Sequence, residues 1–203
     1  MNKLLLISEE PIWDTQVEVL KEDKSDKKNY YISGITIQTD VKNGNGRIYP
    51  LGITEKEVNR YITEKIDKRS AFGELDHPAT AKINPDRVSH MFESLKRDGK
   101  NFISKAKVWD SPMGNIVKVF INENATLGIS TRAVGSLKES NGVQIVQDDL
   151  HLITAGDIVT EPSAPEAFIK GIREGVEYEW VDNQLVESII MNVNKKYRSN
   201  LTP

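Results

Sequence analysis

Three short stretches of the chain carry side chains that could do chemistry. Each combines a histidine, a serine or a carboxylate with small residues or prolines: GELDHPAT (73–80), LGISTRAVG (127–135) and HLITAGDIVTEPSAP (151–165). The first holds His77, the second Ser130, and the third both His151 and Asp157. A serine hydrolase needs a hydroxyl nucleophile, a histidine that takes its proton and a third group that orients the histidine. All three parts are present, but only the fold could bring them together.

The composition removes several other kinds of chemistry. The chain has no cysteine, which excludes disulfides, thiolate zinc sites and a cysteine nucleophile. It has three histidines but no HExxH pattern, and its glycines match no phosphate-binding or dinucleotide-binding motif, so we expect no metal and no cofactor. The net charge of −3 argues against a nucleic-acid partner. No apolar run approaches the roughly 20 residues that span a bilayer, so no membrane partner is expected either.

A metal-dependent hydrolase is the alternative within enzyme chemistry. Its ligands would be His77, His90, Asp86 and His151, and it predicts inhibition by chelators. His90 falls on an expected strand, where a half-buried, hydrogen-bonded histidine is the simpler interpretation. The serine hypothesis predicts indifference to chelators.

The elements that must position these residues indicate an α+β fold. Residues of high β-propensity, several of them flanking Asn-Gly or Asp-Gly turns, predict strands over 30–39, 87–95, 101–109, 127–137 and 143–159. Helical periodicity predicts two helices, over 54–66 and 112–125. In the first helix, Thr54 and Glu57 form a capping-box pattern at the N-terminus.

The chain divides into three parts. Residues 1–28 combine an oily start with the charged run KEDKSDKK (21–28), which predicts a flexible linker. A body follows over 29–172, and a tail over 173–203 contains QLVESIIMNVNKKY, which we expect to be an amphipathic helix. The apolar run at residues 4–7 is too short for a secretory signal, so a cytoplasmic origin is expected. The apolar N-terminal segment therefore needs another explanation.

In their order along the chain, the motifs resemble those of a known family. GELDHP, PDRVSH, GISTRAVG and DIVTEPSAPEAF, with NGNGRIYP near the start of the body, resemble the prohead core protein proteases of T-even-type tailed phages. The resemblance runs from about Tyr31 to about Ile172. These are serine proteases of capsid maturation. The fold that the resemblance implies is that of the herpesvirus maturation proteases, a small β-barrel surrounded by helices.

The resemblance implies roles for individual residues. It places the nucleophile at Ser130 and the general base at His77. For the third member we favour Asp157, because a carboxylate fixes the tautomer of the histidine and stabilises the imidazolium that forms during attack. The alternatives that stay open are His151, Asp76 and Glu74.

Arginines and backbone amides are the candidates for two further roles. Backbone N–H groups near Ser130 or after Asp157 could hold the oxyanion, and Arg132 is a charged candidate with an equally good interpretation as a structural ion-pair partner. A subsite selective for an acidic residue needs a basic pocket, for which the candidates are Arg47, Arg87 and Arg132.

This resemblance offers an explanation for the apolar N-terminal segment, which we interpret as a built-in substrate. Proteases of this family are similar in cutting after Glu with Leu or Ile two positions earlier, and Ile7-Ser8-Glu9 fits that motif. We expect a zymogen whose own segment 4–9 fills the cleft until the chain is cut at Glu9 or the adjacent Glu10. The motif also occurs at LKE (20–22), ITE (53–55), ITE (62–64), INE (121–123), LKE (137–139), IRE (172–174) and LVE (185–187).

The resemblance also implies partners and a location. Scaffolding core proteins and the major capsid protein would be the substrates, inside the viral prohead in the host cytoplasm, and a ring or dimer of the chain is expected. The competing hypothesis is a non-catalytic core or scaffold assembly protein with a protease-like fold. That hypothesis predicts loss of the serine or the histidine, and both Ser130 and His77 are present.

Overall fold

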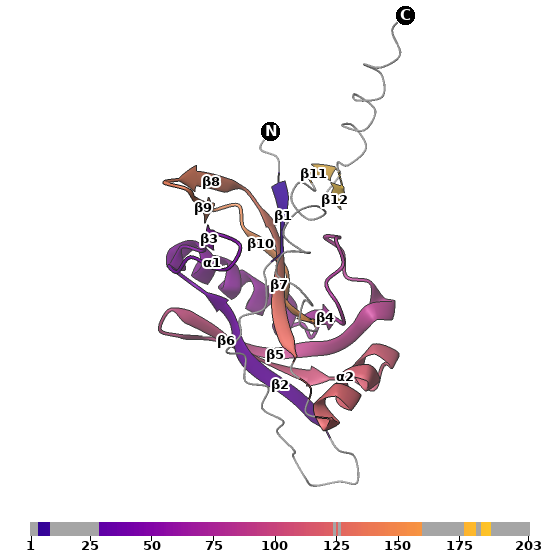
Figure 1. Cartoon of the computed structure of the whole chain (residues 1–203). Coiled ribbons are helices and arrows are strands. Elements are labelled where there is room, and N and C mark those ends of the chain that lie inside the picture. Colours follow the sequence, from indigo (N-terminus) through magenta and orange to yellow (C-terminus); the bar gives the residue numbers. More distant parts are fainter. Residues whose placement is uncertain are drawn as a thin grey trace, which may run out of the picture.

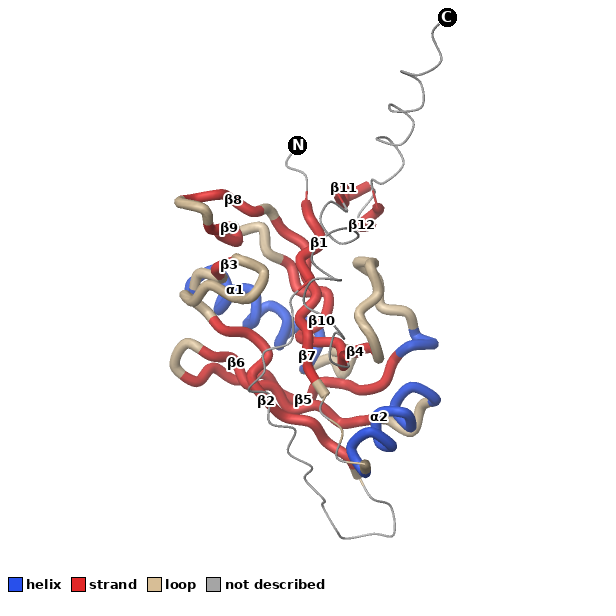
Figure 2. The backbone as a smooth tube through the Cα atoms, in the orientation of Figure 1, coloured by secondary structure: helices blue, strands red, loops and turns tan. Residues whose placement is uncertain are grey.

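The structure is a computed structural model of the 203-residue chain. It describes residues 29–123, 125 and 127–159 with their side chains, and the backbones of three further strands at 4–8, 177–181 and 184–187. Most of the described chain is strand, and its few helices lie against the sheets (Figures 1 and 2). The expected mixture of strands and helices is confirmed in this form.

Twelve strands in the described chain form three sheets. The first, antiparallel throughout, has the order β10 (His151–Val159), β7 (Gly128–Gly135), β1 (Leu4–Ser8), β11 (Glu177–Val181) and β12 (Gln184–Glu187). The second, also antiparallel, has the order β2 (Tyr30–Gln38), β6 (Asn101–Val108), β5 (Val88–Asp98) and β4 (Phe72–Glu74). The third has the order β3 (Arg47–Ile48), β9 (Val143–Val146) and β8 (Leu137–Ser140), with β3 parallel to β9.

Two α-helices of the described chain pack against these sheets. Helix α1 (Leu51–Tyr61) continues as a π-helical turn (Ile62–Ile66) and contacts β10. Helix α2 (Pro112–Asn122) contacts β5 and β6, and Ser111 caps it by accepting a hydrogen bond from the backbone N–H of Gly114. A 3₁₀ turn (Pro85–Arg87) precedes β5.

The core lies between the first two sheets and α1. Strand β6 alternates between buried and half-buried residues, and its buried side contacts the other layers. Fully buried aliphatic and aromatic residues fill the space, each contributing roughly 1.5–3 kcal/mol by the removal of apolar surface from water. They include Ile32, Phe92, Phe102, Ile129, Leu152 and Ile158.

None of the three described sheets closes on itself, so the expected small β-barrel stays a prediction. Strands β4 and β10 approach each other at a parallel bridge between Leu75 and Ile158. On the other side, the hydroxyl of Thr131 on β7 donates to the carbonyl of Thr36 on β2, at 3.1 Å. Within the described residues no backbone ladder joins β7 to β2, and this side-chain hydrogen bond links the two strands instead. The relation to the herpesvirus proteases stays a prediction.

The expected strands and both helices are present. The hairpin turns form where glycines or asparagine allow a positive φ: Gly99 at 59°, and Asn141 and Gly142 at 51° and 73°. The span 143–159 forms two strands, β9 and β10, instead of one. Strand β12 occupies the first four residues of the expected amphipathic helix, and the remainder of that segment and the linker 21–28 lie outside the described residues.

The predicted capping box of the first helix is wrong. Helix α1 begins at Leu51, so Thr54 lies in its first turn and donates to the carbonyl of Pro50. The carboxylate of Glu57 is buried and accepts a hydrogen bond from the backbone N–H of Leu152, at 2.6 Å. A tertiary contact with β10 therefore uses the glutamate that the sequence pattern assigned to the helix end.

A buried histidine joins the two main sheets. His90 on β5 is fully buried, its Nε2 lies 3.1 Å from the carbonyl oxygen of Gly156, and its Nδ1 lies 2.9 Å from the hydroxyl of Ser89. A Cβ on Gly73 would come within 2.1 Å of the ring of His90, so the close approach of β4 to this ring requires glycine. Burial lowers the pKa of His90 to about 4, against the opposing effect of Asp157.

This low pKa predicts a specific loss of stability in acid. Because the unfolded state takes up a proton near pH 6.5 and the folded state only near pH 4, stability falls as the pH drops between these values, by roughly 3 kcal/mol in total. His90→Gln, whose amide can still donate to Gly156, removes this dependence. Urea unfolding of both proteins from pH 7 to pH 4 measures it, and parallel curves for the two proteins would contradict it.

Candidate active site

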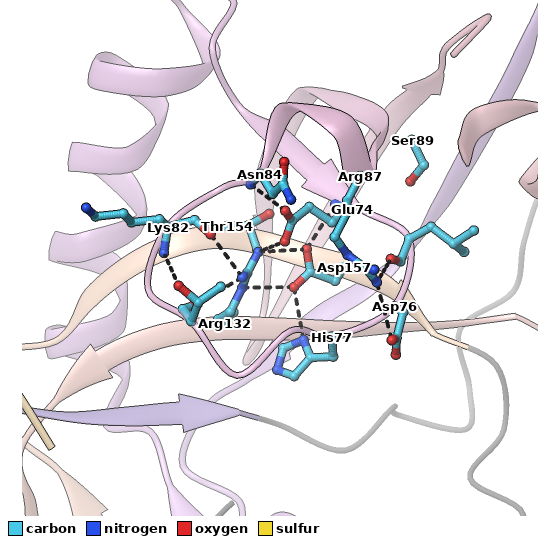
Figure 3. Close-up of polar contacts among 12 residues, drawn as sticks. Glu74, Asp76, His77, Lys82, Asn84, Arg87, Ser89, Arg132, Thr154 and Asp157 are labelled. Atoms are coloured by element: carbon cyan, nitrogen blue, oxygen red, sulfur yellow. Dashed lines mark hydrogen bonds and ion pairs between the residues drawn. The ribbon is translucent and has the colours of Figure 1, made fainter. Parts of the chain in front are cut away.

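The loop that follows β4 brings a histidine to a buried aspartate. The backbone N–H of Asp76 donates to the carbonyl of Ile158, at 2.7 Å, and Asp76 itself adopts φ 68°. This contact holds the loop against β10 beside Asp157. The Nδ1 atom of His77 lies 3.0 Å from Oδ2 of Asp157, and both side chains are buried (Figure 3). A hydrogen bond from Nδ1–H to the carboxylate fixes one tautomer of the ring.

The serine lies directly opposite this aspartate in the first sheet. The ladder between β7 and β10 pairs Ser130 with Asp157, followed by Ile129 with Ile158. Directly paired residues of antiparallel strands place their side chains on the same face of the sheet. Ser130 therefore shares a face with the carboxylate that holds His77. Figure 2 shows β7 and β10 side by side in the centre of the molecule.

A bulge in β10 determines that the side chain of Asp157 lies on the same face as that of Ser130. Thr154 pairs with Arg132 and Asp157 pairs with Ser130, so three steps on β10 match two steps on β7. Without the extra residue, Thr154 and Asp157 would point to opposite faces. Gly156 lies in this irregular stretch, where a Cβ would come within 2.1 Å of the side chain of Ile129.

The second ring nitrogen of His77 is left available. Its Nε2 atom is buried and has no hydrogen-bond partner among the described groups. With Nδ1–H directed to Asp157, Nε2 carries a lone pair that can accept a proton. Ser130, only 2% exposed, supplies a hydroxyl on the same face. An imidazole nitrogen with a lone pair and a serine hydroxyl are the two groups that proton transfer from a hydroxyl nucleophile requires.

A buried arginine lies behind the aspartate, between two carboxylates. One terminal nitrogen of Arg132, Nη2, lies 2.5 Å from Oε2 of Glu74, and its Nε lies 3.0 Å from Oδ2 of Asp157. The second contact is an ion pair whose angle does not make a hydrogen bond. The other terminal nitrogen, Nη1, donates to the carbonyl of Thr80, at 2.9 Å. All three ionic side chains are fully buried, so this geometry favours the ion-pair interpretation of Arg132 over the oxyanion role.

The other candidates for the third member lie elsewhere. The carboxylate of Asp76 is exposed and pairs with Arg87 at 3.3 Å. His151 pairs with Val134 near the start of β10, and burial, followed by the charge of Arg60, lowers its pKa. The carboxylate of Glu74 faces Arg132 (Figure 3). Of the candidates, Asp157 alone contacts the ring of His77 in the described structure.

The remaining predicted residues are also dispersed. Arg47 lies on β3 of the third sheet, whereas Nη2 of Arg87 lies 2.6 Å from the carbonyl of Leu75, two residues before His77. Glu9 and Glu10, the expected self-cleavage residues, lie outside the described residues. Ser8, which directly precedes them, pairs with Arg132 on β7.

The ligands proposed for the metal-dependent alternative do not gather. Within the described ranges 29–123, 125 and 127–159, no group of three or more histidines, aspartates or glutamates is placed to hold a metal ion. His90 is instead hydrogen-bonded to Gly156, and His77 to Asp157. Separately, none of the described helices has the length and apolar character needed to cross a membrane.

Comparison with known proteins identifies the class and then the family. The solved structure of the capsid assembly protease gp21 of bacteriophage T4 is similar, with a TM-score of 0.73 and 30% identity over 79% of this chain and 100% of that chain. The prohead core protein protease of Enterobacteria phage T4 is 36% identical over 146 residues, or 70% of this chain and 69% of that protein. Residues 5–177 match the family of prohead core protein serine proteases. The chain belongs to this family of phage capsid-maturation proteases, which confirms the resemblance found in its motifs.

The position of Asp157 predicts which residue supports His77. Asp157→Asn is expected to lower proteolysis roughly 10³–10⁴-fold, because the amide no longer holds the required tautomer or stabilises an imidazolium. The matched control on the same strand, His151→Gln, is expected to retain activity within about threefold. Cleavage of a peptide with an Ile-x-Glu motif, followed by mass spectrometry, measures both. A large loss in His151→Gln alone would contradict the assignment.

Proposed function

We propose that this chain is a serine endopeptidase in which Ser130 is the nucleophile, His77 the general base and Asp157 the orienting carboxylate. One observation carries the proposal. The Nδ1 atom of His77 is bound to Asp157 at 3.0 Å, while its buried Nε2 has no partner among the described groups. Asp157 in turn lies directly opposite Ser130 in the sheet.

The proposed reaction is acyl transfer in two steps. The oxygen of Ser130 attacks the carbonyl carbon of a peptide bond, and its proton passes to Nε2 of His77. Asp157 stabilises the imidazolium that forms. When the C–N bond breaks, the same proton moves to the leaving amine, and the peptide carbonyl is left as an ester on Ser130. Water then repeats the sequence, releases the acid and restores the serine.

The oxyanion of the tetrahedral intermediate needs hydrogen-bond donors. The guanidinium of Arg132 is buried and directed at Glu74, Asp157 and the carbonyl of Thr80. We therefore assign the oxyanion to backbone N–H groups near Ser130 or after Asp157, which need no reorganisation as charge develops.

The proposed substrates bind as an extended strand along β7. The support comes from β1, which pairs antiparallel with β7 from Leu5 opposite Gly135 to Ser8 opposite Arg132. An added strand makes main-chain hydrogen bonds and offers alternate side chains to pockets. The segment Ile7-Ser8-Glu9 matches the (Leu/Ile)-x-Glu motif. In this proposal β1 therefore represents the part of a substrate that lies N-terminal to the bond to be cut.

The same contact supports the zymogen hypothesis. Strand β7 has β10 on one side and β1 on the other, so no further strand can pair with it while β1 stays in place (Figure 1). Strand β1 is also held by the tail, because Leu4 pairs with Tyr178 and Leu5 with Glu177 on β11. In this proposal, cleavage after Glu9 frees β1 and opens the edge of β7.

Family membership supports a proposal for the partners and the location. We propose that scaffolding core proteins and the major capsid protein are the substrates, and that cleavage takes place inside the prohead in the host cytoplasm. Residues 29–172 would form the protease domain, with 1–28 as the inhibitory segment and 173–203 as the tail. Assembly of several copies into a ring or dimer stays part of this proposal.

Intact mass over time tests the proposal. We expect the purified wild type to lose residues 1–9, with or without a chelator, and Ser130→Ala to keep its full mass because it lacks the attacking hydroxyl. Ser94→Ala, on β5, is the matched control and should be trimmed like the wild type. If no protein is trimmed and peptides with an Ile-x-Glu motif also survive, the non-catalytic assembly protein becomes the better interpretation.

A further inference from the structure

Two buried charged residues have no role in the three-residue mechanism. Glu74 on β4 and Arg132 on β7 are both fully buried, and they bind each other next to Asp157. Burying an ion pair is unfavourable unless hydrogen bonds and attraction offset the loss of hydration, and apolar residues often serve stability equally well. A purely structural core would therefore not need this pair.

We propose that Glu74 and Arg132 are a positioning pair that fixes the orientation and the charge balance of Asp157, and through Asp157 act on His77. This inference rests on the proposed function. Neither side chain touches the substrate or the reacting atoms in this proposal.

The orientation of Asp157 follows from its contacts. Its Oδ1 accepts a hydrogen bond from the backbone N–H of Glu74, at 2.9 Å, and lies 3.3 Å from Nη2 of Arg132. Its Oδ2 faces Nδ1 of His77 and Nε of Arg132, each at 3.0 Å (Figure 3). Because both oxygens have fixed partners, the carboxylate cannot rotate away from the imidazole without breaking several contacts.

The charge balance explains why the arginine needs a second carboxylate. A lone guanidinium beside Oδ2 of Asp157 would oppose the positive charge that His77 gains during attack. Glu74 offsets that cation: one arginine and two carboxylates carry a net charge of −1 while His77 is neutral, and zero once it is protonated. The negative charge that the imidazolium needs is therefore retained.

The other charged groups around Asp157 and His77 do not supply this balance. Arg87 and Asp76, on the flanks of the same loop, pair with each other. His90, which lies on β5 near Asp157, has a pKa of about 4 and is neutral at the pH of the assay.

The pair also holds both ends of the loop that contains His77. Glu74 is the last residue of β4, directly before this loop, and its Oε1 accepts a hydrogen bond from the backbone N–H of Asn84. Arg132 donates to the carbonyl of Thr80. A merely structural role as a loop anchor would use these same contacts, so the experiment must separate the two roles.

The experiment measures kcat, KM and the pH profile of Glu74→Gln and Glu74→Asp. Glu74→Gln removes the charge at nearly constant size. We expect kcat to fall roughly 10–100-fold with KM within about twofold, and the acidic limb of the kcat/KM profile to move about one pH unit lower, because the imidazolium loses a nearby anion. Glu74→Asp keeps the charge, so its acidic limb should stay in place even if kcat falls.

A double-variant cycle provides the second test. Glu74→Gln is also introduced into Asp157→Asn, where we expect a further change in kcat of less than about twofold, because the group through which Glu74 acts is gone. The control, Glu55→Gln, removes a carboxylate from an exposed pair with Arg97 and should leave both kcat and the pH profile unchanged. Circular dichroism verifies the fold of each variant.

The outcomes are distinct. An unmoved acidic limb in folded Glu74→Gln, or an equal loss of kcat in both backgrounds, would overturn the positioning role and leave a loop anchor. If Glu74→Gln does not fold, Glu74→Asp takes its place in the double-variant cycle: a loss of kcat that disappears in the Asp157→Asn background supports the proposal, and an equal loss in both backgrounds or a shifted acidic limb overturns it. If Ser130→Ala cleaves as fast as the wild type, the proposed function itself fails.

Discussion

The site is arranged around the buried carboxylate of Asp157, which must be paired and hydrogen-bonded. An ionised carboxylate removed from water is stable only when it is paired and hydrogen-bonded. Asp157 meets this need with the backbone N–H of Glu74, the guanidinium of Arg132 and the ring of His77. Glu74 and His77 come from the end of β4 and the loop after it, and Arg132 comes from β7, so satisfying Asp157 on β10 brings together three segments that are distant in sequence. The fold and the candidate chemistry thus depend on the same set of contacts.

Strand β7 combines three tasks in the proposed mechanism. It carries Ser130, and it presents Arg132 two residues further on the same face. Its edge opposite β10 pairs with β1. An enzyme that binds substrate on the strand bearing its nucleophile can be blocked by any strand that occupies that edge. A segment of the same chain does so here, and the tail strand β11 pairs with its other side. In the proposed mechanism, inhibition and substrate binding would therefore share one set of backbone hydrogen bonds.

Local features of the fold were predictable from the sequence, and features that depend on long-range contacts were not. The Asp98-Gly99 and Asn141-Gly142 turns have a local cause, and both hairpins form as expected. The capping box failed because Glu57 binds the backbone of Leu152, 95 residues away. Barrel closure stays a prediction, because among the described residues β7 and β2 are linked by a side-chain hydrogen bond from Thr131 to the carbonyl of Thr36 and not by a backbone ladder. In the site, the spacing of Ser130 and Arg132 placed both on one strand face, but burial of the arginine between two carboxylates had no local signal. The glycine in TAGD was the one hint of the bulge that aligns Asp157 with Ser130.

The most direct test of a triad made of Ser130, His77 and Asp157 is the site at which a serine-directed fluorophosphonate attaches to the folded protein. Such a reagent reacts with a hydroxyl that a neighbouring histidine deprotonates. Peptide mass spectrometry is expected to find one adduct, on Ser130, which disappears in His77→Ala and forms far more slowly in Asp157→Asn. An adduct on a different serine that forms equally fast in all three proteins, or substrate cleavage that continues while Ser130 is fully modified, would contradict the triad.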